Sequence, residues 1–216
     1  MPFSSSIRRF KQHLFSLTLF VLVSVSSVAN AQFDNGPPLL SGSSIDLLSD
    51  NNAPLHVAED FMLPGSSPTI SEVVWFGWNG PFTGTPPPRR GFNLQIYAGT
   101  ATGPSGPPIY ALDDLFPKRR QHNVAGAPAL LYGVWPLYKY RFKLPSTISL
   151  SPGTPYWISI YASSTGTTSS TPFWAWVKTS HVGNNTMRVP PWIPYFDPVS
   201  FWLPPNSGEM AFKIKP

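Results

Sequence analysis

Proline occurs throughout this chain, and its distribution limits what the chain can fold into. The 216 residues include 27 prolines and 16 glycines, and beyond residue 31 no window longer than a turn or two has a helical period. A proline inside a helix costs about 3 kcal/mol, because it removes a backbone donor and its ring clashes with the preceding turn. Short apolar runs bounded by Gly and Pro are typical of strands. The sequence therefore predicts an all-β fold.

The most regular strand pattern lies between residues 151 and 177. A Pro152-Gly153 turn precedes residues 156–162, in which aromatic and β-branched side chains alternate, and residues 173–177 form a second aromatic run after a polar loop. Successive side chains of a strand point to opposite faces. We expect these two runs to form a hairpin at the centre of a sheet.

Similar patterns predict further strands at residues 45–48, 57–63, 69–78, 92–98, 109–112, 137–144 and 210–214. The run at 69–78 is apolar on both faces from Val73 onward, which predicts that both faces are covered or that one carries exposed aromatic side chains. Many short strands separated by turns indicate an antiparallel β-sandwich, and we expect one of jelly-roll type. We expect a single domain at residues 45–216, preceded by a flexible leader at residues 32–44.

Residues 137–144 show the clearest alternation. The side chains of Tyr138, Tyr140, Phe142 and Leu144 should point inward, and those of Lys139, Arg141 and Lys143 toward water. We interpret the basic stripe as a solvated face, which would also suit an edge strand that lysine protects from pairing. A site for an acidic ligand is the alternative.

The N-terminus has the pattern of an export signal. A basic start (Arg8, Arg9 and Lys11) is followed by a mostly apolar run at residues 14–25 and by Ala29-Asn30-Ala31. These features predict a signal peptide at residues 1–31 that is cleaved before Gln32, and a secreted or periplasmic protein. The apolar run is shorter than the roughly 20 residues of a membrane helix, so we expect no membrane span after cleavage.

Charge and cysteine content narrow the classes of function. Three of the 15 basic residues and none of the 10 acidic ones precede Gln32, so the remainder carries a net charge of +2 (12 − 10). We therefore expect no nucleic-acid partner. The chain contains no cysteine, which excludes a thiol nucleophile, thiolate metal ligands and a disulfide framework. An exported domain without disulfides favours a bacterial source.

Several short motifs follow one another in an order that resembles a known group of proteins. They are Ala58-Glu59-Asp60-Phe61, Trp75-Phe76-Gly77, Ile96-Tyr97-Ala98, the run Pro152-Gly153-Thr154-Pro155-Tyr156-Trp157-Ile158, and Met210-Ala211-Phe212-Lys213-Ile214. The chain resembles exported bacterial β-sandwich domains of uncharacterised function, which often lie beside cell-surface sorting signals. The resemblance covers residues 57–214. It implies a sandwich fold and supplies no catalytic residues.

Acidic residues are few and do not form an evident catalytic pair. Glu59 and Asp60 are adjacent, so within a strand they should point to opposite faces, whereas a glycosidase needs two carboxylates about 5 to 10 Å apart across its substrate. Glu59 and Asp60, with His56 nearby, are candidates for a metal site such as a structural calcium site. We expect no other cofactor.

Aromatic residues make up 14% of the chain, including eight tryptophans. Trp157 and Tyr161 share one face of their strand, and Trp174 and Trp176 share one face of theirs. If both pairs lie on the same outer face, the four side chains form an exposed aromatic platform that can stack on sugar rings. The alternative is that these side chains fill the core.

Two hypotheses about function remain. The favoured one is a non-catalytic exported module that binds, or has a structural role, at the cell envelope or in the extracellular matrix, with a glycan as its ligand. The alternative is a polysaccharide hydrolase whose carboxylates come together from distant parts of the chain. The sequence leaves the oligomeric state open.

Overall fold

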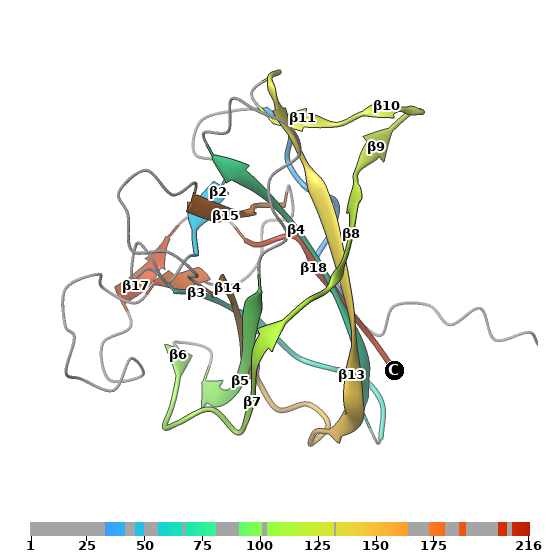
Figure 1. Ribbon diagram of the computed structural model, residues 1–216. Helices are drawn as coiled ribbons and strands as arrows, with labels where there is room; N and C mark the ends of the chain where they lie inside the picture. Colours follow the sequence, from blue (N-terminus) through green and yellow to red (C-terminus); the bar gives the residue numbers. More distant parts are fainter. Residues whose placement is uncertain are drawn as a thin grey trace, which may run out of the picture. The chain divides into compact units, whose positions relative to one another are not determined.

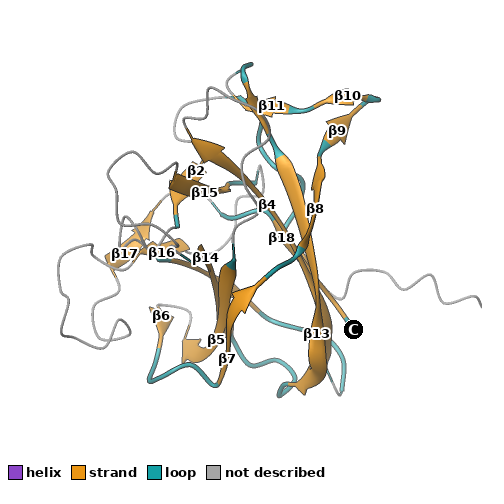
Figure 2. Ribbon diagram, viewed as in Figure 1, coloured by secondary structure: helices purple, strands orange, loops and turns teal. Residues whose placement is uncertain are grey.

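The computed structural model describes residues 33–41, 46–49, 56–66, 68–80, 91–100, 103–131, 133–163, 173–179, 186–188, 203–206 and 209–216. The chain divides into two compact units, Met1–Asn30 and Ala31–Pro216, and every described residue belongs to the second. The predicted signal peptide therefore lies outside the described residues. Regular structure in the described ranges is entirely β, and none of them contains a helix long and apolar enough to cross a membrane (Figure 2).

Seven strands form an antiparallel sheet, here called sheet I (Figure 1). Its main path runs β1-β18-β4-β13-β8, and β15 joins β4 to β2. The strands are β1 (Phe33–Asp34), β2 (Asp46–Leu48), β4 (Thr69–Gly80), β8 (Lys118–Gln121), β13 (Tyr138–Ser149), β15 (Phe173–Val177) and β18 (Phe212–Lys215). The long strand β4 is central, since it pairs with β13, β15 and β18.

Sheet II also has seven strands, in the order β17-β16-β3-β14-β5-β6, with β7 paired to β5. The strands are β3 (Val57–Phe61), β5 (Phe92–Thr100), β6 (Gly103–Pro104), β7 (Tyr110–Leu115), β14 (Tyr156–Ala162), β16 (Thr186–Arg188) and β17 (Leu203–Asn206). Two small hairpins follow β8, and they consist of β9 (Asn123–Val124) with β10 (Ala127–Pro128) and β11 (Leu130–Leu131) with β12 (Trp135–Pro136).

The hydrophobic core lies between the two sheets. Trp75 of sheet I packs edge-on against Phe92 of sheet II at 5.5 Å between ring centroids, and Phe61 of sheet II packs against Phe212 of sheet I at 6.3 Å. Gly77 leaves room for a tryptophan, because a Cβ at this position would lie 2.4 Å from the Trp174 ring. The predicted antiparallel β-sandwich is confirmed, and the jelly-roll type stays a prediction.

The strand alternation is confirmed for most of the predicted core. Leu94, Ile96, Ile158, Ile160 and Phe212 are buried. In β13, Tyr138, Tyr140 and Leu144 are buried, and Phe142 is partly buried against the same core.

All residues of β4 from Val73 to Gly80 are buried, so both faces of this strand are covered. β13 lies between β4 and β8, so it is not an edge strand, and the basic strand β8 occupies that edge.

The predicted aromatic hairpin is wrong. β14 lies in sheet II between β3 and β5, whereas β15 lies in sheet I between β2 and β4. Strands that follow one another in sequence pair or neighbour only about two-thirds of the time. Here the chain passes to the opposite sheet instead, which lets both aromatic strands contribute side chains to the same core.

The described part of the predicted leader, residues 33–41, contributes strand β1 to sheet I, and the flexibility of the leader stays a prediction. Phe33 pairs with Ile214 in the β1–β18 ladder, and its ring lies 5.3 Å from that of Phe212. Asn35 is buried and donates a hydrogen bond from Nδ2 to the carbonyl oxygen of Met210 at 2.9 Å. Phe33 is partly buried against the core through this aromatic contact, which explains why the segment extends sheet I.

Candidate functional site

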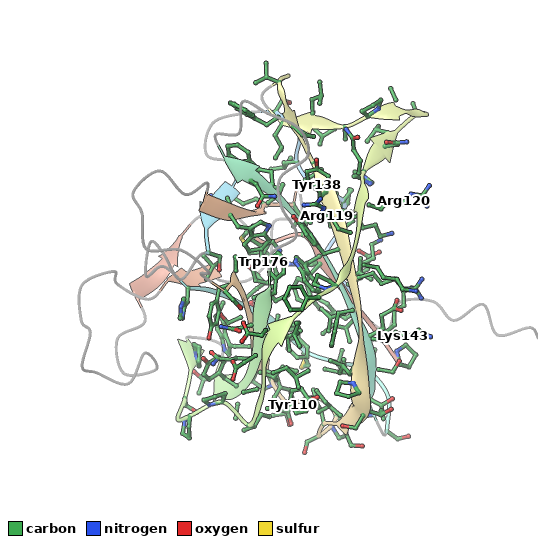
Figure 3. The ribbon with its side chains drawn as sticks, in the orientation of Figure 1. Tyr110, Arg119, Arg120, Tyr138, Lys143 and Trp176 are labelled. Atoms are coloured by element: carbon green, nitrogen blue, oxygen red, sulfur yellow. The ribbon has the colours of Figure 1, made fainter. Side chains whose placement is uncertain are left out.

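The outer face of sheet I, which is turned away from sheet II, carries a group of basic side chains. Residues paired across a ladder point to the same face. The register places Lys215, Glu72 and Lys143 in one row, Lys213, Val74, Arg141 and Lys118 in the next, and Phe76, Lys139 and Arg120 in a third. Figure 3 shows Arg120 and Lys143 on the side of the sheet turned away from Trp176, which is buried in the core.

We call these seven cations the basic face, and they are Lys118, Arg120, Lys139, Arg141, Lys143, Lys213 and Lys215. The chain beyond residue 31 has 12 basic residues, so more than half of them lie on this face. The same rows contain two acidic residues, Glu72 and, through the β1–β18 pairing, Asp34. The face therefore has a surplus of five positive charges, although the whole chain beyond residue 31 carries only +2.

Glu72 neutralises part of this charge from within the sheet. Only 2% of its surface is exposed; Arg141 Nε contacts Oε2, and Lys215 Nζ lies 2.8 Å from Oε1. Burial would raise the pKa of Glu72, but the close contacts and positive charges of Lys215 and Arg141 together outweigh it and hold the pKa below its ordinary value. Glu72 is thus an anion that holds two cations in place.

The other cations differ in their partners. Lys213 pairs with Asp34 at 2.5 Å. Within the ranges that the structure describes, Lys118, Arg120, Lys139 and Lys143 form no ion pair. Burial and the charges of Lys213, Lys215, Arg141 and Arg120 lower the pKa of Lys139. Repulsion between the cations is therefore present on this face in the absence of a ligand.

A shallow pocket opens at one end of the basic face. Its volume is about 180 Å³, and it is lined by Arg120, Gln121, His122, Asn123 and Lys139. The His122 ring packs edge-on against Phe76 at 5.1 Å. Burial lowers the pKa of His122, and the charges of Lys139 and Lys213 lower it further. The site thus combines basic groups with neutral amide donors.

The predicted aromatic platform is wrong, because the structure buries all four of its residues. Trp174 and Trp176 belong to the core between the sheets, and Trp176 donates a hydrogen bond from Nε1 to the carbonyl oxygen of Ala211 at 3.1 Å. Trp157 lies on the opposite face of sheet II against Ala58 and Tyr97, where its indole donates to the carbonyl oxygen of Thr100 at 2.9 Å.

Tyr161, the fourth of these residues, is also covered. Its ring stacks on that of His56 at 3.7 Å between centroids, and burial lowers the pKa of His56 to about 4. His56 is therefore neutral near neutral pH. The sequence left open the alternative that these four aromatic side chains fill the core or pack against it. Their burial supports this alternative.

The structure places the two candidate metal ligands, Glu59 and Asp60, on opposite faces of sheet II. Glu59 pairs in register with Ile158 on the core side of sheet II, and its Oε2 accepts the backbone N–H of Met210 at 2.9 Å. Asp60 pairs with Trp157 on the other face, as the adjacent positions predicted. Among the described residues, no group of three or more His, Asp or Glu side chains could hold a metal ion. The structural calcium ion therefore stays a prediction, and the described residues provide no site for it.

The sequence identified the basic residues of β13 but did not predict their assembly with β8 and β18. The alternation of Lys213 and Lys215 with Phe212 and Ile214 was a usable signal, because it placed two more cations on one face of a strand. Which strands lie beside β13 is a property of the ladder, and a single strand's pattern does not contain it.

Comparison of the chain with protein-family models, with curated proteins and with solved structures gives no match. The resemblance to exported bacterial β-sandwich domains therefore stays a prediction.

Proposed function

We propose that this protein is an exported, non-catalytic β-sandwich module that binds an acidic polysaccharide through the basic face. The observation that carries the proposal is the set of seven cations on three strands of one sheet face, with two acidic residues among them. The glycan ligand expected from the sequence is retained, but its contact surface changes from the buried aromatic residues to the basic face.

The spacing of the cations suits a polymer with regularly repeated charges. Lys139, Arg141 and Lys143 occupy alternate positions of one strand, so their Cα atoms are about 6.5 to 7 Å apart. Lys118 and Arg120 lie beside them on β8, at the usual distance of about 4.8 Å between strands. The result is a two-dimensional grid of positive charge, which attracts polyanions at long range and loses this attraction as salt increases.

The predicted export signal favours an acidic polysaccharide over nucleic acid as the polyanion, because the protein would act outside the cytoplasm. The composition of the pocket bears on the hydrolase alternative. Its lining of two basic residues, one histidine and two amides suits anion binding, whereas a glycosidase needs paired carboxylates. We propose no catalytic residue.

The test measures binding to dextran sulfate, to polygalacturonate and to neutral dextran over a range of salt concentrations. We expect the wild-type protein to bind at least one of the two polyanions and not neutral dextran. In the double variant Lys118→Gln/Lys143→Gln, which spares Glu72 and its partners, we expect about tenfold weaker binding. The slope of log K against log salt should decrease in magnitude by about one to two.

A matched control distinguishes the basic face from overall charge. Asp113 is exposed in β7 of sheet II, so adding Asp113→Asn to Lys143→Gln restores the net charge without restoring the face. We expect this variant to bind as weakly as Lys143→Gln alone. Equal binding of neutral dextran and polyanions, or recovery of affinity through Asp113→Asn, would contradict the proposal.

A further inference from the structure

The pocket at the end of the basic face has the size and chemistry of a site for one charged group. Its volume of about 180 Å³ is smaller than the roughly 300 to 1,000 Å³ of sites for drug-sized ligands. Arg120 and Lys139 are direct partners in the β8–β13 ladder, so they lie side by side on the outer face. Two adjacent cations therefore line the pocket.

The backbone fixes His122 beside these two cations. Its N–H donates to the carbonyl oxygen of Leu137 at 2.9 Å, and its own carbonyl oxygen accepts the N–H of Ala129 at 2.8 Å. The ring rests on Phe76 of β4. His122 is thus held at the point where β8 passes into the first small hairpin, and the neighbouring Asn123 and Gln121 also line the pocket.

The charged groups around His122 are mostly cations. Arg120 lies on β8, Lys139 on β13 and Lys213 on β18, and the side chain that packs against the ring is the neutral Phe76 of β4. The two carboxylates of the basic face have partners of their own, since Glu72 holds Arg141 and Lys215, and Asp34 holds Lys213. Burial is the largest cause of the lowered pKa values of His122 and Lys139, and repulsion from neighbouring cations lowers them further. An anion in the pocket would relieve that repulsion.

We infer that this pocket binds a tetrahedral oxyanion, the sulfate or phosphate ester group of an acidic polysaccharide, in preference to a carboxylate. The inference rests on the proposed function and specifies its ligand. Such an ester presents three terminal oxygens, which match Arg120, Lys139 and protonated His122, whereas a carboxylate presents two. The planar guanidinium of Arg120 can contact two of these oxygens at once.

Binding should also take up a proton. Because the anion offsets the charges of Lys139 and Lys213, the pKa of His122 rises in the complex from its lowered value in the free protein. Affinity is then highest when His122 is protonated in the complex, and it falls as the pH rises through the pKa of the bound state.

The experiment compares three sugars that carry an acidic group at the same position: glucose 6-sulfate, glucose 6-phosphate and glucuronate. Each is titrated into the purified protein at the same ionic strength, with calorimetry and the NMR signals of the His122 ring as readouts. We expect either ester to bind at least about fivefold more tightly than glucuronate and to shift the His122 signals. The two esters together show whether sulfate or phosphate is the better ligand.

Variants locate the site and test the proton uptake. Lys139→Gln and Arg120→Gln should each weaken ester binding by about tenfold, whereas Lys143→Gln, the same kind of change on the same strand outside the pocket, should change it by less than about twofold. Between about pH 5.5 and about pH 8, glucose 6-sulfate should lose affinity for the wild-type protein. His122→Gln should bind it with little dependence on pH.

The results separate this inference from the proposed function. Equal affinity for glucuronate, an unchanged His122 signal, or a loss in Lys143→Gln as large as that in Lys139→Gln would overturn the inference. If polyanions still bound the protein in that case, the proposed function would stand. Ester-selective binding in the pocket without any polyanion binding would instead overturn the proposed function alone.

Discussion

Glu72 shows at the scale of a single residue how sheet I accommodates its positive charge. The side chain lies between Lys143 and Lys215 in the ladder, is 2% exposed, and contacts both Arg141 and Lys215. Removing its charge while keeping its shape would leave two cations without their common partner. A buried polar group that loses its charge-assisted contacts lowers the free energy of unfolding.

Glu72→Gln should therefore lower the free energy of unfolding by about 1 to 3 kcal/mol near neutral pH. The folded state lowers the pKa of Glu72, so its contribution is present above the ordinary carboxyl pKa and is lost as the pH falls through the lowered, folded value. The difference from wild type should shrink in acid. Urea unfolding at a series of pH values measures this, and a difference that grows on acidification would contradict the assignment.

Strand β18 shows at the scale of the element how one alternating pattern serves two purposes. Phe212 and Ile214 are buried in the core, while Lys213 and Lys215 belong to the basic face. The Phe212 ring packs against Phe33, Phe61 and Trp176, which come from three other strands. The strand thus joins β1, the core and the proposed binding surface.

Phe212→Ala should cost about 3 to 5 kcal/mol of stability, because a fully buried aromatic side chain is removed. Phe142→Ala, in the neighbouring part of sheet I, should cost less, about 1 to 3 kcal/mol, since Phe142 is only partly buried. Denaturant unfolding of both variants gives the comparison, with exposed Lys143→Ala as the control near wild type. A larger effect at Phe142 would mean that the core is centred elsewhere.

Charge is unevenly distributed at the scale of the whole molecule. The basic face carries a surplus of five positive charges, so the rest of the chain beyond residue 31 has a net charge of −3 when the total is +2. A molecule with one basic face would approach a polyanion in a preferred orientation. Net charge alone gave no indication of this, because the two parts largely cancel.

The exported protein should begin at Gln32, directly before β1. Cleavage there leaves Phe33 free to pair with Ile214, whereas cleavage a few residues later would remove this pair and its contact with Phe212. N-terminal sequencing of protein recovered outside the cytoplasm measures the site. Recovery of a chain that still begins with Met1, or of one that begins after Asp34, would contradict the prediction.

The sequence alone determined the fold class and predicted every described strand of five or more residues, but it missed most of the shorter ones. The many prolines indicated a β fold, in agreement with the described ranges, and the period of two in β5, β13, β14 and β18 indicated which side chains share a face. This information is local, because the alternation follows from the backbone geometry of each strand by itself. It therefore identified core residues such as Ile96 and Ile158 before any pairing was known.

Only the tertiary structure decided which strands are neighbours and what covers each face. β14 and β15 entered different sheets, which buried the four residues of the predicted aromatic platform instead of exposing them. The basic face depends on β8, β13 and β18 lying in one sheet, although Lys118 and Lys215 are distant in sequence. Ladder pairing and burial are set by contacts between distant segments, and the pattern of one strand carries no information about its partner.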